Sequence, residues 1–282
     1  MTPHLEFELL KVGHCTHPEC VAMRGGRWAS VPFPALCGLL RHPQRGWLLF
    51  DTGYSAHFMA ATQPFPQRLY RWTTPSLLPE HERLTVQLRR RGIAPEDISG
   101  IVISHLHGDH IAGLRDFPRA RFFVMRTELD SMRRRCAWNN LRHGVLPALL
   151  PDDFADRLHF ADDCPTVKLP SALSAFGEGM DLFGDGSVLA VHLPGHTLGQ
   201  IGLALHDETG RITFLCADAC WSLQAIRDDL RPTWLARQLF DNATHYLETF
   251  ARLRRLHLAA SDVRLIPSHC MHSWLSHDKR NV

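Results

Sequence analysis

The segment ISHLHGDHIAGL (residues 103–114) places three imidazoles and one carboxylate within six positions. Such crowding is costly unless the groups bind a common ligand, because each one loses hydration and like charges repel. Residues i and i+2 of an extended segment point the same way, so His105 and His107 can reach one cation. Gly108 permits a turn, after which Asp109 and His110 can face a second point nearby. The segment therefore predicts two metal ions a short distance apart; the alternative is a polar loop with hydrogen-bonded histidines.

Three further residues of ligand type each follow an apolar run. They are His196 in LPGHTLGQ, Asp218 in LCADACW and His269 in LIPSHC. Alone, each is a weak signal, since a histidine after Pro or Gly is usually a loop residue. Together with the first segment they make five histidines and two aspartates, which is the stoichiometry of a dinuclear site with nitrogen and oxygen ligands.

Two divalent ions in such a site would hold a bridging water and lower its pKa, which gives hydroxide at neutral pH. That hydroxide would attack a carbonyl or phosphoryl centre, and Asp109 is the candidate to pass a proton to the leaving group. Zinc is the default for a histidine-rich site, with iron, manganese and cobalt as alternatives.

The elements that must position these residues are short. Strands are predicted at residues 5–12, 46–53, 100–105, 120–125, 187–196, 200–205, 211–219 and 263–269. Helices are predicted at 81–92, with Gly92 just past its end, at 127–136, with Thr127 as a cap, and at 242–258. This mixture predicts an α/β sandwich. We expect one domain over residues 1–282, with a proline-containing loop or lid inserted near 55–80.

The sequences LLFDTGY (48–54) and FLCADACW (214–221) have a common form, in which an apolar strand is followed by Asp, small residues and an aromatic. Each half of the chain thus delivers an aspartate at the end of a strand. The repeat predicts two similar halves that face each other, with a site along the shared edge; chance is the alternative for so short a match.

Composition excludes several classes of protein. The chain has 282 residues, 45% of them hydrophobic and 21% charged, with a formal net charge of +2. A balance so near zero gives no sign of a nucleic-acid or membrane partner. The eight cysteines are too sparse for a disulfide scaffold. Without an apolar segment of signal or membrane-spanning length, we expect a cytoplasmic protein with reduced thiols.

The motifs SHLHGDH, PGHT and PSH, with Asp218 at a strand end, resemble the metallo-β-lactamase superfamily in order and spacing, over residues 50–269. The resemblance implies a four-layer αββα sandwich with two facing β-sheets. It implies that His105, His107 and His196 bind a first metal, that Asp109, His110 and His269 bind a second, and that Asp218 bridges the two. It also implies that Asp51, in FDTG, orients a ligand from behind.

Among the branches of that superfamily, the chain is most similar to the quorum-quenching N-acyl homoserine lactone lactonases. The shared features are LLFDTGY, SHLHGDHIAGL and an HTxGxxGL pattern that begins at His196. The resemblance implies a small-molecule substrate with an acyl tail, a lactone or related ester, opened by a metal-bridging hydroxide. The chain departs from that branch at Trp221, where a tyrosine is usual. We expect Trp221 at the wall of the pocket, together with Phe58 and Tyr70.

Other functions stay open. The cluster Arg133, Arg134 and Arg135 could contact the phosphates of coenzyme A or of an acyl carrier, which favours a thioesterase or another ester hydrolase. A phosphodiesterase is a further alternative, although the chain lacks a strongly basic character. A non-catalytic binding module is a fourth, yet all seven candidate ligands are present. The sequence leaves the oligomeric state open, a dimer included.

Overall fold

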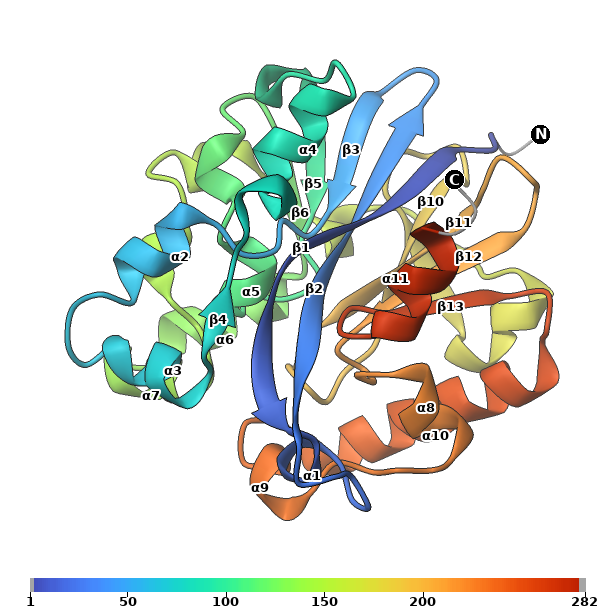
Figure 1. Cartoon of the computed structure of the whole chain (residues 1–282). Coiled ribbons are helices and arrows are strands. Elements are labelled where there is room, and N and C mark those ends of the chain that lie inside the picture. Colours follow the sequence, from blue (N-terminus) through green and yellow to red (C-terminus); the bar gives the residue numbers. More distant parts are fainter. Residues whose placement is uncertain (1–2, 279–282) are drawn as a thin grey trace.

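Two β-sheets face each other in the computed structural model, which describes residues 3–278 (Figure 1). The first sheet has the strand order β4-β1-β2-β3-β5-β6-β7, and the second has the order β13-β12-β11-β10-β9-β8. The strands of the first sheet are β1 (Glu6–Pro18), β2 (Ser30–His42), β3 (Gly46–Phe50), β4 (Ser76–Leu77), β5 (Ile98–Val102), β6 (Arg121–Val124) and β7 (Leu158–Phe160). Those of the second are β8 (Thr166–Lys168), β9 (Glu178–Asp181), β10 (Val188–His192), β11 (Ile201–His206), β12 (Ile212–Ala217) and β13 (Arg264–Pro267).

Helices lie on the outer sides of the two sheets (Figure 1). Beside the first sheet are α2 (Ala56–Ala61), α3 (Arg68–Thr73), α4 (Leu84–Arg90), α5 (Gly108–Ile111), α6 (Arg126–Arg134) and α7 (Ala137–Arg142). Around the second sheet and at the ends of the strands are α1 (Glu19–Ala22), α8 (Leu223–Arg227), α9 (Trp234–Arg237) and α10 (Ala243–Ala259). Helix α11 (Met271–Asp278) follows β13 and contacts β1 and β2 of the first sheet. None of the helices in the described residues is long and apolar enough to cross a membrane.

Three separate apolar clusters show how the layers pack. The first joins Leu88 of α4 to Leu49 of β3, on the outer face of the first sheet. The second fills the space between the sheets, where Leu48 meets Leu215 of β12. The third joins Phe214 of β12 to α10. Because neighbouring residues of one strand alternate between clusters, each sheet is covered on both faces. The predicted αββα sandwich is therefore confirmed.

Strand direction explains why polar residues gather at one edge. In the first sheet β3, β5, β6 and β7 run parallel. In the second, β10 and β12 both run antiparallel to β11, and β13 runs parallel to β12. The carboxyl ends of parallel strands lie at the same edge. The loops that follow β3 and β5 therefore meet one another, as do the loops that follow β10, β12 and β13.

Among the departures from the sequence expectations, three concern elements near the site or residues that were singled out. The strand β2 was not predicted, since its prolines at 32 and 34 are typical of loops or edges. Helix α6 begins with Met125 as its N-cap, so the prediction of Thr127 as the cap was wrong. The segment expected to be a loop or lid contains α2 and α3 and the short strand β4, which pairs with β1.

Candidate metal centre

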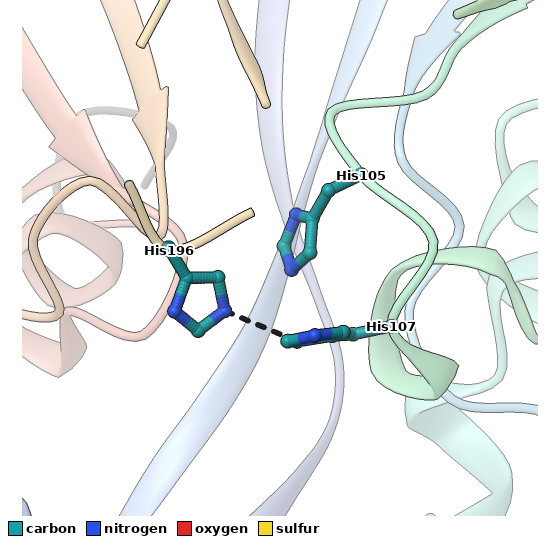
Figure 2. A group of neighbouring side chains, drawn as sticks. All are labelled: His105, His107 and His196. Carbon is teal, nitrogen blue, oxygen red and sulfur yellow. Dashed lines mark hydrogen bonds between the residues drawn. The ribbon is translucent and has the colours of Figure 1, made fainter. Parts of the chain in front are cut away.

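Seven side chains from both sheets meet at this shared edge. His105 and His107 follow β5, and Asp109 and His110 lie in the first turn of α5. From the second sheet come the side chains that follow β10, β12 and β13, which are His196, Asp218 and His269. Figure 2 shows His196 facing His105 and His107 across the gap between the two halves. The structure thus brings together all seven residues that the motifs singled out.

Their ligand atoms form three overlapping groups. Within each group these atoms lie within 4.8 Å of one another. The groups are His105, His107 and His196; His105, His110 and Asp218; and Asp109, His110 and His269. Because Asp218 shares a group with His105 and lies 3.1 Å from His269 Nε2, it stands between the other two groups.

Hydrogen bonding shows that these residues fit a cation. Among the described residues, the buried atoms without a hydrogen-bond partner include His105 Nε2, His110 Nε2 and Asp218 Oδ1. Beside them, His196 Nε2 and His107 Nδ1 face each other at 3.0 Å. A buried polar atom left unpaired costs about 1–3 kcal/mol, so a cluster of them in one place is unusual. Imidazole nitrogens and carboxylate oxygens that converge in this way are the ligands that zinc prefers.

The first group is neutral at physiological pH. Burial lowers the pKa of His107 to about 4 and that of His196 to about 3. Burial, followed by the neighbouring His110 and His107, holds the pKa of His105 well below its ordinary value. Neutral imidazole is the form that binds a metal, so this group needs no deprotonation near pH 7.

The second group is more strongly charged. Burial lowers the pKa of His110, but the carboxylates of Asp109, Asp51 and Asp218 outweigh it and hold the pKa well above its ordinary value. Burial also lowers the pKa of His269, but the charge of Asp218 outweighs it, so the pKa is raised. In return, His269 and His110 overcome the burial of Asp218 and hold its pKa well below its usual range.

Hydrogen bonds on the side away from the cluster fix the orientation of two imidazole rings. Asp51 Oδ2 accepts from His110 Nδ1 at 2.8 Å, and Asp51 also accepts from the amide and hydroxyl of Ser104. His269 Nδ1 donates to the carbonyl of Pro34 at 2.8 Å. In both histidines Nε2 is left to face the cluster. Asp51 itself has φ 60°, a conformation that is uncommon for a residue other than glycine and is often found at functional sites.

Glu128, on α6, connects the two halves of the cluster and was missed by the sequence analysis. Its Oε1 accepts from the amide of Leu106 at 3.0 Å, and its Oε2 accepts from the amide of Gly199 at 3.2 Å. Glu128 is 3% exposed. The one signal in the sequence was a carboxylate on the inward face of the predicted helix, and its partners lie far away along the chain.

Aromatic side chains surround the cluster. Trp221 Nε1 donates to Asp218 Oδ2 at 3.1 Å, and its ring meets those of His196 and Phe240 edge-on. On the other side, Phe58 is fully buried and contacts Tyr70 edge-on, with ring centroids 5.3 Å apart. Trp221 therefore touches two of the candidate ligands, while Phe58 packs against Tyr70.

The arginine cluster is divided in the structure. Arg135 pairs with the buried carboxylate of Asp241, which also accepts from the amide of Leu198 at 3.1 Å. Arg133 and Arg134 are exposed on α6. Arg135 therefore supports the loop that carries His196, while the other two face solvent.

Comparison with known proteins identifies the class. Residues 30–260 match the sequence profile of the Metallo-beta-lactamase superfamily, and the chain belongs to that superfamily. It is a metal-dependent hydrolase. Several relatives are named N-acyl homoserine lactonase, among them the following two. One, AttM of Azorhizobium caulinodans, is 24% identical over 92% of this chain and 90% of its own length. The other, from Bacillus cereus, is 24% identical over 70% of this chain and 68% of its own.

Two solved structures share the fold. An N-acyl homoserine lactone hydrolase with the product N-hexanoyl-L-homoserine at its catalytic metal centre superposes with a TM-score of 0.70, at 19% identity, over 98% of this chain and 97% of that one. AidC, a dizinc quorum-quenching lactonase in complex with a product, has a TM-score of 0.66 at 17% identity, over 96% and 89% of the two chains. At these identities the likeness establishes the fold.

Proposed function

We propose that the chain is a dinuclear metal hydrolase that opens lactones or related esters with an acyl tail, in the manner of the N-acyl homoserine lactone lactonases. The observation that carries the proposal is the arrangement of three ligand groups around Asp218. The names of the relatives and of the structural neighbours support the same substrate class.

Each of the seven candidate ligands has a role in metal binding. His105, His107 and His196 would hold one divalent ion, and Asp109, His110 and His269 would hold the other. Asp218 lies between the groups, where its carboxylate would serve both ions. When bound, the two ions supply a polarising charge for the ester oxygen and a hydroxide nucleophile at neutral pH. We favour zinc, because histidine and carboxylate donors in groups of three match its preference.

The chain itself orients the ligands and handles the proton. Asp51 and the carbonyl of Pro34 keep His110 and His269 turned toward the cluster. Asp109 is half-buried, and its Oδ2 lies 3.6 Å from His269 Nε2, so a substrate can reach this carboxyl more easily than Asp218. In our proposal the Asp109 carboxylate takes up the proton that the nucleophile gives up as it adds to the ester, and passes it to the leaving alkoxide.

A thioesterase acting on acyl-coenzyme A or an acyl carrier is the second candidate. The exposed guanidinium groups of Arg133 and Arg134 favour it, because they are free to meet phosphates. Arg135, which pairs with Asp241, does not share that freedom.

A hydrolysis panel separates these functions. The zinc-loaded protein would be given N-acyl homoserine lactones, acyl-coenzyme A thioesters and a phosphodiester, each with and without a chelator. We expect turnover of the lactones that the chelator abolishes. Turnover confined to thioesters or to the phosphodiester would contradict the lactone assignment, and turnover that survives chelation would contradict the metal mechanism.

A further inference from the structure

The phenol of Tyr70 lies beside the histidine cluster. We propose that it binds substrate there, donating a hydrogen bond to the carbonyl oxygen of the ester or lactone, and that Gly108 is needed to make room for it. The inference rests on the proposed function, since it deepens the account of the same site.

The position of the phenol follows from its distance to Gly144. A Cβ atom added to Gly144 would lie 3.5 Å from the Tyr70 hydroxyl and 3.5 Å from Cγ and Cδ2 of His107. The hydroxyl and the imidazole therefore flank the same small space. The amide of Gly108 donates to the carbonyl of Gly144 at 3.1 Å, which fixes this part of the backbone next to the ligand loop.

Gly108 is required for space rather than for its backbone angles, because its φ lies outside the left-handed region. A Cβ there would come within 2.9 Å of Phe58 Cε2 and 3.4 Å of Tyr70 Cε1. Phe58 cannot retreat easily, since it is fully buried and packs edge-on against Tyr54. A larger residue at 108 would therefore press on Tyr70, which is half-buried, and shift its ring.

Tyr70 differs from the other two tyrosines of the chain in its access to a ligand. Tyr54 and Tyr246 are each 1% exposed, whereas Tyr70 is half-buried on α3. Burial and then the charge of Asp109 raise the pKa of Tyr70 well above its ordinary value. The phenol therefore keeps its proton at neutral pH and is a hydrogen-bond donor.

A fixed donor beside the ligands would stabilise the negative charge that grows on the carbonyl oxygen during attack. No covalent bond to Tyr70 forms or breaks, and its proton stays on the phenol. Phenylalanine would fill the same space against Phe58 but could not donate, so the hydroxyl is the part of the side chain that acts on the substrate.

The test compares Tyr70→Phe with Tyr54→Phe, a matched control that removes a hydroxyl from the same aromatic stack. Metal content, kcat and KM would be measured on the best substrate of the hydrolysis panel. Binding of N-hexanoyl-L-homoserine would be measured by calorimetry. We expect Tyr70→Phe to keep its metal, lose about 100-fold in kcat/KM and bind the product more weakly. Tyr54→Phe should stay close to wild type.

Gly108→Ala provides an independent test, because it leaves the phenol in the chain but moves it. It should reproduce the defect of Tyr70→Phe with normal metal content, and the double variant should be no worse than either single one. A Tyr70→Phe protein with wild-type turnover and wild-type product binding would overturn the inference.

Failure of the proposed function would look different. If the wild type cleaves thioesters or the phosphodiester instead of lactones, the substrate assignment fails, while the Tyr70→Phe comparison on that substrate still decides the role of the phenol. A wild-type protein that neither cleaves nor binds any of these compounds would overturn both.

Discussion

Asp218 is the residue on which the contacts of the site converge. Its Oδ2 accepts from Trp221 Nε1 at 3.1 Å and lies 3.1 Å from His269 Nε2. The same oxygen is 3.3 Å from His196 Nε2, and Oδ1 is 3.4 Å from His110 Nε2. A carboxylate has enough lone pairs to serve partners on both sides, which an amide or a single imidazole lacks.

Asp218→Asn should therefore lose more than about 100-fold in kcat, since the loss of a supporting residue alone typically costs 10–100-fold. The amide is neutral and offers one acceptor oxygen in place of two. Activity and metal content would be measured together, with Asp228→Asn, an exposed aspartate on the surface, as the control. Full turnover with two metals bound would show that Asp218 is not the bridge.

Trp221→Phe should lower activity about 10-fold, because the ring remains but the hydrogen bond that orients Asp218 is removed. Trp234→Phe is a suitable control, since Trp234 is 66% exposed. A pronounced change in metal affinity should accompany the loss of activity. If Trp221→Phe behaves like the control, the indole does not position the carboxylate.

At the scale of elements, helix α6 acts as a clamp. Glu128, in its first turn, accepts hydrogen bonds from Leu106 in the loop after β5 and from Gly199 in the loop after β10. A Cβ on Gly199 would come within 2.5 Å of the Glu128 amide nitrogen, so the second loop lies directly on the helix. The spacing between His107 and His196 thus depends on a carboxylate that touches neither.

Glu128→Ala should weaken metal binding about 10–100-fold, because the two loops lose their common support. It should also lower the free energy of unfolding by about 1–3 kcal/mol, since two amides lose their partner. Glu128→Gln keeps one acceptor and should fall between Ala and wild type. Titration with zinc and chemical denaturation would check both effects, with the exposed Glu80→Ala as control. Wild-type zinc affinity in Glu128→Ala would disprove the clamp.

Sequence and structure agree where a ligand-type side chain follows directly after an apolar run. His105, Asp218 and His269 could be found because each follows a buried strand, and strands that run parallel bring their ends to one edge. The role of Glu128 could not be found, because its partners are distant in the chain. The spatial role of Gly108 could not be found either, since it depends on where Phe58 packs. Strand β2 was missed because prolines, such as those at 32 and 34, are more typical of loops or of the edge of a sheet.

At the scale of the whole molecule, the two ligand groups, each assembled from both sheets, differ in charge. The first group holds two imidazoles from the first half and His196 from the second, all with lowered pKa values. The other group holds His110 and His269, whose pKa values are raised. Metal and protons therefore compete more strongly at the second group than at the first.

As the pH falls, the second metal should leave before the first. A raised pKa means that His110 and His269 take up protons at a higher pH than His107 and His196, whose pKa values are about 4 and about 3. Protein equilibrated with zinc at a series of pH values from 8 to 4 should pass from two ions to one before losing the last. Simultaneous loss of both ions would contradict this order.

The division of the ligands between the two sheets has a consequence for the order of folding and metal binding. His107 and His269 lie far apart along the chain, and their two ligand groups come together only when the sheets have packed. An unfolded chain can therefore not use the proposed dinuclear centre as a template, and we expect the second ion to bind late in folding. Refolding with a zinc-responsive dye should show uptake of the second ion no faster than the slowest folding phase.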